Sequence, residues 1–340
     1  MGDDMTTPTA VDPPVADHGR ERAGWREYVA IARIDHWVKH VFIVPGFFLA
    51  WLLGSPDRPA FSLFALLVGI LATALASSAN YVINEFLDAP FDAHHPTKRH
   101  RASVRRRMAP GIVALEYLAL AGIALASAFA VSIPLGWTML AFLASGIAYN
   151  VRPLRTKDAV YWDVATEAVN NPIRLTIGWL IIDPTTLPPS SLLFAYWAGG
   201  AFLMSTKRLS EYRTIIAAGA RSALERYRAS FRYYSDERLL LQSFAYAQLA
   251  SFFLAVFLVK YRIEYILTFP MLAALFVVYL RIGLRVGSSA AAPEKLYRER
   301  RLLGLVGVIA IAFGVLTAVD IPFLEGLTEP YLIAISPGVR

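Results

Sequence analysis

Long hydrophobic runs alternate with short charged segments along almost the whole chain. A bilayer core of roughly 30 Å requires about 20 apolar residues per helix, and nine runs are of that order. They lie near residues 37–53, 61–87, 109–131, 135–150, 162–182, 190–206, 239–259, 263–284 and 302–319. The pattern predicts an all-α polytopic membrane protein with nine transmembrane helices.

Lysine and arginine residues gather on one side of these predicted helices. If successive loops lie on alternating sides of the membrane, 28 of the 33 Lys and Arg residues fall on the side that also carries the N-terminus. Because basic residues near helix ends concentrate on the cytoplasmic side, we expect the N-terminus in the cytoplasm and the C-terminus outside.

The composition agrees with a membrane protein, since 56% of the residues are hydrophobic and only 17% are charged. The net charge of +7 lies mostly on one side, so it indicates orientation and contact with anionic lipid headgroups rather than nucleic-acid binding. The absence of cysteine excludes disulfides, thiolate metal sites and cysteine nucleophiles. Residues 1–27 are polar and predict a disordered cytosolic leader. Residues 28–340 are then a single transmembrane catalytic domain.

Carboxylates interrupt the hydrophobic pattern at the end of the second predicted helix. Asn84 and Asp88 are four residues apart and share a helix face. Pro90 disfavours helix at Ala89, so we expect Asp92 just past a bend and turned back toward Asp88. Two converging carboxylates at a membrane boundary suit Mg2+, which keeps waters and completes its shell with substrate phosphate oxygens. The alternative is a solvated acidic helix end.

Basic residues follow this cluster and recur in the next loop on the same side. Lys98 and Arg101 come six and nine residues after Asp92 and could neutralise the same anion. Arg155 and Lys157 lie between the fourth and fifth predicted helices. Loops on the cytoplasmic side carry such bases for orientation alone, which is the alternative interpretation of both groups.

A polar stripe lies inside the fifth predicted helix. Asn171 and Arg174 follow Glu167 by four and seven residues, so the three side chains share one face. Charged groups inside a membrane are costly and should face the bundle interior. The stripe therefore predicts the wall of a polar cavity that binds substrate, with an internal ion pair that only fixes helix packing as the alternative.

A third basic group stands at the end of the sixth predicted helix. Lys207 and Arg208 precede Glu211 by four and three residues. One carboxylate beside two cations favours a phosphate site over a metal site. Residues 221–238 then predict an amphipathic helix along the membrane surface, with most of its arginines contacting headgroups.

These clusters resemble those of the UbiA superfamily of intramembrane prenyltransferases. The first acidic motif of that family has the form Asn-Asp-x-x-Asp-x-x-x-Asp, and here Asn84, Glu85, Asp88 and Asp92 match it, with Glu in the second place. The resemblance covers the chain from about residue 33 onward. It implies a UbiA-like bundle of nine helices in which Asn84, Asp88 and Asp92 act as the Mg2+ and catalytic residues.

The family's second acidic motif usually carries a pair of aspartates. At that position this chain has Lys207, Arg208 and Glu211 instead. Together with the segments RIDHWVKHVFIVP and ALERYRASF, it looks like the decaprenyl-phosphate phosphoribosyltransferase branch. That branch transfers phosphoribose from phosphoribosyl diphosphate to a polyprenyl phosphate and releases diphosphate. The resemblance implies a cell-envelope enzyme in the bacterial inner membrane, with its site facing the cytoplasm and Lys39 at the acceptor phosphate. The expected residues for donor phosphate and ribose are Lys98, Arg101, Arg155, Lys157, Glu167, Asn171, Arg174, Lys207, Arg208 and Glu211.

Two other functions remain open at this stage. A prenyltransferase would move a polyprenyl group from its diphosphate to an aromatic acceptor, but it would use the second aspartate pair that this chain lacks. A transporter would also place polar residues in helices, but every polar cluster here lies at one side of the membrane. The sequence leaves the oligomeric state open, a homo-oligomer included.

Overall fold

The computed structural model describes residues 20–95, 97–291 and 293–326, and the elements within them are helical. This confirms the all-α class. The α-helices are α1 Trp25–Ile31, α2 Val44–Leu53, α3 Leu63–Asp92, α4 Ala102–Arg105, α5 Pro110–Val131, α6 Ile133–Asn150, α7 Trp162–Ala168, α8 Asn170–Ile182, α9 Ser190–Ala217, α10 Arg221–Tyr227, α11 Asp236–Tyr261, α12 Phe269–Gly283, α13 Arg300–Ala318 and α14 Pro322–Glu325. The 3-10 helices are η1 Ile34–Ile43, η2 Lys98–His100, η3 Thr156–Asp158, η4 Ala229–Arg232, η5 Ile263–Thr268, η6 Ser289–Ala291 and η7 Pro293–Arg298.

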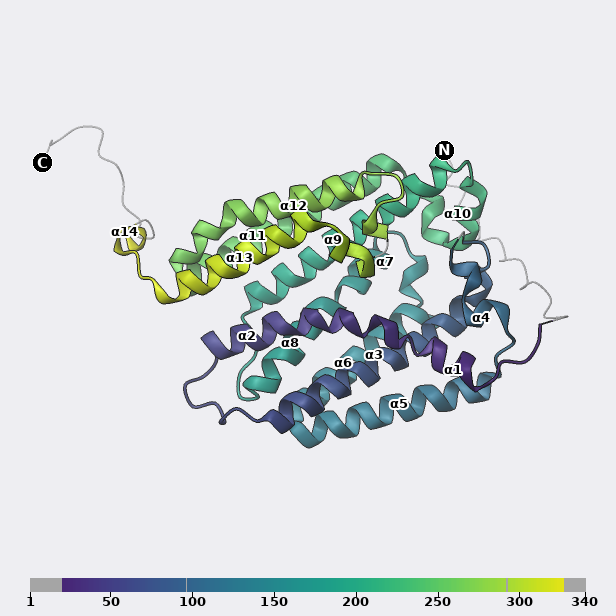
Figure 1. Ribbon diagram of the computed structural model, residues 1–340, viewed down its shortest axis with the longest axis horizontal. Coiled ribbons are helices and arrows are strands. Elements are labelled where there is room, and N and C mark those ends of the chain that lie inside the picture. Colours follow the sequence, from purple (N-terminus) through teal and green to yellow (C-terminus); the bar gives the residue numbers. More distant parts are fainter. Residues whose placement is uncertain (1–19, 96, 292, 327–340) are drawn as a thin grey trace, which may run out of the picture.

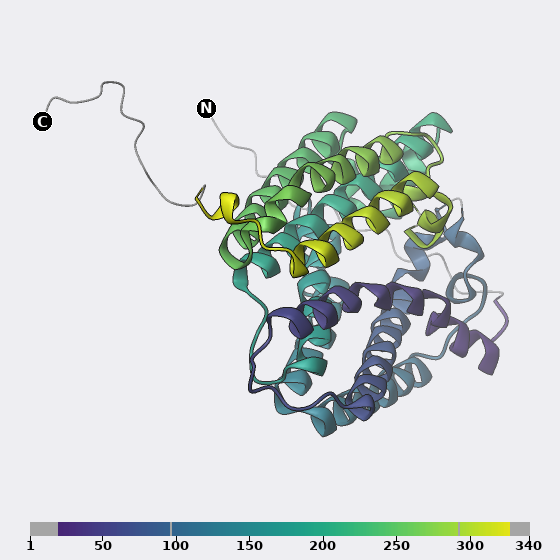
Figure 2. The same cartoon turned by 60° about the vertical axis from the view of Figure 1, so that its left-hand side comes forward.

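The helices form two groups that follow the order of the chain. Helices α2, α3, α5, α6 and α8 make one group, and α9, α11, α12 and α13 make the other (Figures 1 and 2). Within the groups α3 packs against α5, α2 against α8, and α9 against α11. The short helix α7 and its successor α8 both contact α9 and so join the two groups. Polar residues of α3, α6, α7 and α9 meet in the space between them.

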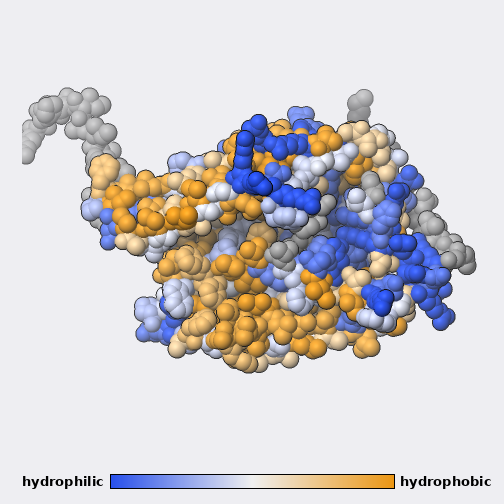
Figure 3. Space-filling view, in the orientation of Figure 1, coloured by the Kyte–Doolittle hydropathy of each residue, from blue (hydrophilic) through white to orange (hydrophobic). Residues whose placement is uncertain are grey.

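Long apolar helices identify an integral membrane protein. Five helical segments of the described residues are long and apolar enough to cross a bilayer, or six if the bent pair formed by residues 25–37 and 40–53 is counted as one span. Helix lies in each of the nine predicted ranges, but the number of crossings and the sidedness of the termini stay predictions. Hydrophobic residues cover the sides of the bundle, whereas hydrophilic residues gather at the end that carries α1 and α4 (Figure 3).

The leader and the domain boundary stay predictions as well. Residues 1–19 of the predicted leader lie outside the described residues, and residues 25–27 belong to α1. The described part of the region 28–340 contributes to one bundle, with hydrophobic cores on both sides of the polar space.

The fifth predicted helix is broken, in contrast to the continuous helix expected from the sequence. Helix α7 ends at Ala168 and α8 begins at Asn170. Pro172 has no N–H to donate to the carbonyl four residues earlier, which is that of Ala168. The Asn171 side chain supplies the donor instead, with its Nδ2 3.1 Å from that oxygen, and Asn170 Nδ2 donates over 3.1 Å to the Glu167 carbonyl. The break separates the polar stripe into two helices that still face one cavity.

The bend predicted at Ala89 is wrong, because α3 continues through Pro90 to Asp92. Pro90 lies in the last turn of a helix of 30 residues, where a proline removes only one hydrogen bond from a ladder that is about to end. Asp88 and Asp92 therefore stand four residues apart on one helix face. This places both carboxylates beside the same small cavity, as the metal hypothesis needs.

The predicted surface helix over residues 221–238 is also interrupted. The chain forms α10, then η4, and α11 begins at Asp236. Tyr227, Phe231 and Tyr234 pack into a hydrophobic core with residues of α9. This part of the chain thus packs against the end of the bundle. One of its arginines, Arg228, donates a hydrogen bond to the Tyr149 hydroxyl.

Candidate active site

Asp88 accepts bonds from three side chains at the end of α3. Asn84 Nδ2 lies 3.2 Å from its Oδ2, Arg155 Nη2 lies 3.1 Å from its Oδ1, and the Lys157 ammonium pairs with the same Oδ1. Asn150 Oδ1 joins the group by accepting from Asn84 Nδ2 at 2.5 Å and from Lys157 Nζ at 2.7 Å. The predicted cations of this loop therefore surround the predicted metal ligand.

Lys157 is a buried cation in the loop between α6 and α7. Burial lowers the pKa of its ammonium to about 8, although the neighbouring Asp88 carboxylate acts in the opposite direction. Arg155, on the same loop, adds to the lowering through charge repulsion. Lys157 is thus a cation that loses its proton much more readily than an exposed lysine does.

Asp92 and Glu85 share one arginine, Arg101. Arg101 Nη1 lies 2.7 Å from Asp92 Oδ2 and 2.9 Å from Glu85 Oε1. Glu85 also accepts from Arg33 Nη1 at 2.8 Å and from Ser103 Oγ at 3.3 Å. The glutamate in the second place of the motif is therefore buried in a clamp that ties α3 to the segments before η1 and around α4.

Arg208 is enclosed by carboxylates and is almost fully buried, with 1% of its side chain exposed. Its Nη1 lies 3.1 Å from Glu211 Oε2, its Nη2 lies 2.8 Å from Glu167 Oε2, and its Nε lies 3.5 Å from Asp163 Oδ2. Tyr149 donates its hydroxyl to the same Glu167 oxygen over 2.8 Å. The guanidinium of Arg208 is thus directed at protein carboxylates and links α7 to α9.

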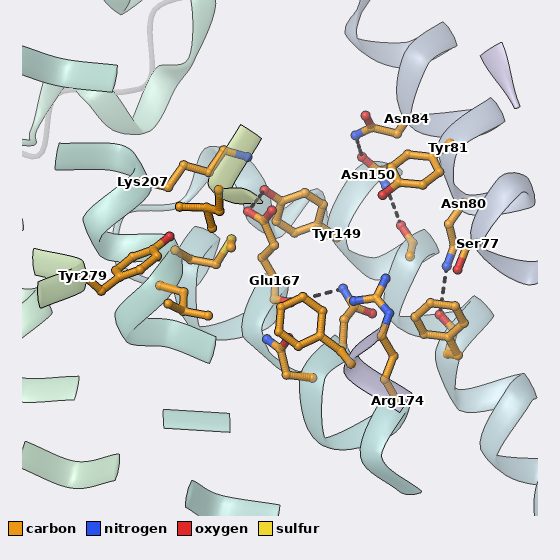
Figure 4. A pocket seen from close by; sticks show the side chains of 18 residues that line it. Ser77, Asn80, Tyr81, Asn84, Tyr149, Asn150, Glu167, Arg174, Lys207 and Tyr279 are labelled. Atoms are coloured by element: carbon orange, nitrogen blue, oxygen red, sulfur yellow. Dashed lines mark hydrogen bonds between the residues drawn. The ribbon is translucent and has the colours of Figure 1, made fainter. Parts of the chain in front are cut away.

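Lys207, the neighbour of Arg208, faces the cavity instead (Figure 4). In the part of the chain that the structure describes, Lys207 forms no hydrogen bond or ion pair, although Glu167 and Glu211 lie close enough to act on its charge. Its ammonium is therefore available to an anionic ligand. Adjacent residues of one helix end thus have different roles.

Lys98 approaches the site from η2. Its ammonium donates to the Tyr227 hydroxyl, and it lies near Glu211 and Asp92. Burial opposes the charge, but Tyr227, Glu211 and Asp92 together outweigh burial and hold the pKa of Lys98 above its ordinary value. The nearby His95 has its pKa lowered to about 4, first by burial and then by Lys98. Lys98 is therefore charged, whereas His95 is neutral at physiological pH.

The candidate site residues divide among three neighbouring cavities. Glu167, Asn171, Arg174 and Lys207 line an inner cavity of about 220 Å3 together with Asn84. A larger outer cavity of about 920 Å3 is lined by the other basic residues near α4 and by the end of α9, and a small one lies against the α3 carboxylates. The outer cavity contains Lys98, Arg101 and Glu211, and the small one contains Asp88, Asp92, Arg155 and Lys157.

The α3 carboxylates fit a Mg2+ ion of the kind expected from the sequence. Asp88 and Asp92 offer hard oxygen ligands beside one cavity, and Mg2+ is commonly bound through one or two carboxylates with the rest of its shell taken from water and substrate phosphates. Among the described residues no three His, Cys, Asp or Glu side chains group together as a metal site. A metal here would therefore depend on the substrate for much of its coordination.

Two predicted residues stand apart from this network. Arg174 lines the inner cavity but has no ion pair to the group around Arg208 in the described residues; its close neighbour is the Phe142 ring, 5.2 Å away. Lys39 lies in η1, and its side chain is outside the described residues. The proposed acceptor role of Lys39 stays a prediction.

The sequence reasoning missed two residues of the site. Asn150 bridges Asn84 and Lys157, and its only sequence signal is its place at the end of α6 before a basic loop. Arg228 donates from Nη1 to the Tyr149 hydroxyl at 3.2 Å, although it was grouped with headgroup-binding arginines. The sequence gave no sign of this role. Arg228 turns inward because the helix is interrupted after α10, and that interruption depends on tertiary packing.

Comparison with known proteins places this geometry in a family. Residues 42–305 match the sequence profile of the UbiA prenyltransferase family. The decaprenyl-phosphate phosphoribosyltransferase of Mycobacterium tuberculosis is 28% identical over 209 residues, which is 60% of this chain and 66% of that protein, just under two thirds of its length.

Solved structures agree on the fold. A UbiA homologue from Archaeoglobus fulgidus bound to GPP and Mg2+ superimposes with a TM-score of 0.63 at 20% identity, covering 86% of this chain and 100% of that one. The same homologue bound to DMAPP and Mg2+ gives a TM-score of 0.64 at 20% identity over the same shares of the two chains.

Proposed function

Because the chain belongs to the UbiA prenyltransferase family, we propose that it is a membrane transferase that moves 5-phosphoribose from phosphoribosyl diphosphate to a polyprenyl phosphate. Diphosphate is the second product. The reaction takes place at the cytoplasmic face of a bacterial inner membrane, within a single catalytic domain over residues 28–340, and supplies cell-envelope biosynthesis.

The charge arrangement at the end of α9 carries this proposal. Prenyl transfer with two metals would use carboxylates at this position, but Asp163, Glu167 and Glu211 are all engaged by Arg208. What remains for a ligand is the Lys207 ammonium. A donor with a diphosphate at one end and a phosphate at the other suits a site that offers one carboxylate pair and separate cations.

The relative from Mycobacterium tuberculosis supports the same choice by its name, decaprenyl-phosphate phosphoribosyltransferase, at 28% identity. An apolar groove supports a lipid acceptor. It has a volume of about 440 Å3 and is lined by side chains such as Leu254, Leu272 and Phe276. The groove shares Asn171, Leu203 and other residues with the inner cavity. An isoprenoid tail in the groove would place its phosphate in the polar space.

The residues of the chain would act mainly by positioning and by electrostatics. Asp88 and Asp92 would hold Mg2+ on the diphosphate of the donor. When bound there, the ion supplies positive charge to the leaving group. Lys207, Lys98 and the other cations of the site would bind the donor phosphates and keep the ribose in place.

Bond changes are simple because the acceptor is already ionised. An oxygen of the polyprenyl phosphate forms a bond to the anomeric carbon of the ribose, and the bond from that carbon to the diphosphate oxygen breaks, with the electron pair leaving on diphosphate. An acceptor phosphate is an anion at neutral pH, so the reaction needs no general base.

Incubation of the purified protein with radiolabelled phosphoribosyl diphosphate, polyprenyl phosphate and Mg2+ tests the proposal. We expect label in the lipid fraction together with released diphosphate. Label that stays in the aqueous phase with an intact, monodisperse protein would refute it.

Prenyl transfer to an aromatic acceptor is the second candidate function. It is favoured by the solved homologues, which are bound to GPP or DMAPP with Mg2+. Incubation with a polyprenyl diphosphate and an aromatic acid such as 4-hydroxybenzoate tests it, and a prenylated aromatic product would establish it.

A further inference from the structure

Arg174 is a cation that lines the inner cavity of the membrane domain, where Glu167 acts on its charge from beyond ion-pair distance. Its Nε is buried and has no hydrogen-bond partner, and among the described residues no carboxylate lies within ion-pair distance of its guanidinium. Its guanidinium lies over the face of the Phe142 ring. Removing a charge from water costs several kcal/mol unless it is paired, and charged groups inside membranes mark ligand sites. The site is therefore incomplete without an anionic ligand.

The inner wall around Arg174 offers further polar groups. Ser77 Oγ is buried without a hydrogen-bond partner and lines the same cavity. Asn171 lies beside Arg174 on α8, and it fits because position 200 is glycine: a Cβ there would stand 2.0 Å from Asn171 Nδ2. Figure 4 shows Arg174 and Lys207 on opposite sides of the cavity. The cavity thus has two separate cationic positions.

The inner cavity that Arg174 lines shares residues with the apolar groove through which a lipid would enter. Asn171, Leu203 and Tyr279 line both the inner cavity and the apolar groove between α9, α11, α12 and α13. Lys98 and Arg101, in contrast, line the outer cavity near the hydrophilic end of the bundle. A water-soluble donor would use the outer route, whereas a ligand with an apolar tail would come through the groove.

We propose that Arg174 binds the phosphate of the lipid acceptor, in place of the donor role that its spacing from Glu167 suggested. This inference rests on the proposed function and adds the recognition element for its second substrate. The planar guanidinium suits two phosphate oxygens at once. Asn80 lines the cavity one helical turn before Asn84 on α3. A phosphate held through two oxygens by Arg174 near Asn80 keeps its third oxygen free to point toward the donor bound at Asp88.

Equilibrium binding in detergent micelles tests the proposal without turnover. The probes are a radiolabelled polyprenyl phosphate, the corresponding polyprenol, phosphoribosyl diphosphate and 4-hydroxybenzoate. For the wild type we expect the lipid phosphate to bind more than tenfold tighter than the alcohol, as expected for a charged hydrogen-bonded pair. Arg174→Gln should remove this preference and leave phosphoribosyl diphosphate binding within about twofold, the range expected for a distant site. Arg281→Gln, which removes an exposed arginine, is the matched control and should change neither.

Each other outcome overturns the proposal. Unchanged lipid-phosphate binding in Arg174→Gln removes the assignment, and a selective loss of phosphoribosyl diphosphate binding returns Arg174 to the donor. Loss of 4-hydroxybenzoate binding alone identifies an aromatic carboxylate as the ligand. If Arg174→Gln does not fold, the same binding measurements are made on Arg174→Lys and Asn171→Ala. If both variants prefer the lipid phosphate over the alcohol as strongly as the wild type does, the proposal is refuted. Failure of the transfer assay leaves these binding results unaffected, so the two proposals fail separately.

Discussion

The end of α3 and the second half of α9 carry opposite arrangements of charge at the candidate site. On α3, the carboxylates of Asp88 and Asp92 are held by cations from the following loops. On α9, the cation of Arg208 is held by three carboxylates, and Lys207 beside it faces the cavity. A metal at α3 would have to displace the cations paired with Asp88 and Asp92, whereas α9 offers the Lys207 ammonium to a phosphate. A charged side chain at a site therefore indicates a ligand only when the partners of that charge within the protein are known.

Arg208→Gln should have the largest effect, and on folding. It removes the cation shared by Asp163, Glu167 and Glu211, of which Asp163 and Glu211 are buried, and breaking buried pairs costs about 3–5 kcal/mol in free energy of unfolding. Arg213→Gln on the same helix is the control, since the Arg213–Asp236 pair is partly exposed and such pairs contribute about 0–1 kcal/mol. Unfolding in detergent measures both. If Arg208→Gln unfolds like the wild type and only raises the donor KM, Arg208 belongs to the ligand site.

Asp88→Asn should reduce turnover by about 100-fold or more, the size of effect seen when a key electrostatic group of an active site is removed. Its fold should survive, because asparagine can still accept from Asn84. The transfer assay with labelled donor measures the loss. Asp236→Asn, at the start of α11 and away from the cavities, is the control and should keep its activity. More than a few per cent of activity in Asp88→Asn would place the metal elsewhere.

Lys207→Ala should raise the donor KM by about tenfold with little change in kcat, because a charged hydrogen bond of about 1.5–3 kcal/mol is lost in ground state and transition state alike. Steady-state kinetics with varied phosphoribosyl diphosphate measures this. Lys260→Ala, at the opposite end of α11, is the control. A fall in kcat at constant KM would contradict the assignment of Lys207 to donor binding.

Turnover aside, Lys157 should give a pH dependence of stability. Its ammonium has a pKa of about 8 in the fold and an ordinary value of 10.5 when exposed. Between these values the unfolded chain binds more protons, so stability rises with pH by up to about 3 kcal/mol. Melting temperatures of the wild type and Lys157→Met across this range measure it. Parallel curves for the two proteins would show that Lys157 does not titrate as stated.

Local spacing made the α3 part of the site predictable from the sequence. Asn84 and Asp88 are one helical turn apart, and they contact each other in the structure. The cations at Arg155 and Lys157 could be suspected from their loop, but not their common partner Asp88. That pairing joins residues 67 and 69 positions apart, so it depends on how α3 packs against α6.

The rest of the site depended on tertiary structure. The enclosure of Arg208 joins α9 to residues of α7 that lie 41 positions earlier in the case of Glu167, so it depends on how these two helices pack. Local rules also failed at Pro90, because α3 contains this proline and continues to Asp92. The hydrophobic pattern therefore predicted the helices well and their interruptions poorly.

A competition assay tests the central claim most directly. The purified protein receives phosphoribosyl diphosphate, a polyprenyl phosphate, a polyprenyl diphosphate and 4-hydroxybenzoate in one reaction with Mg2+, and mass spectrometry identifies the lipid products. The charges at α9 predict phosphoribosylated polyprenyl phosphate as the product. Prenylated 4-hydroxybenzoate without phosphoribosylated lipid would contradict the account and return the chain to prenyl transfer.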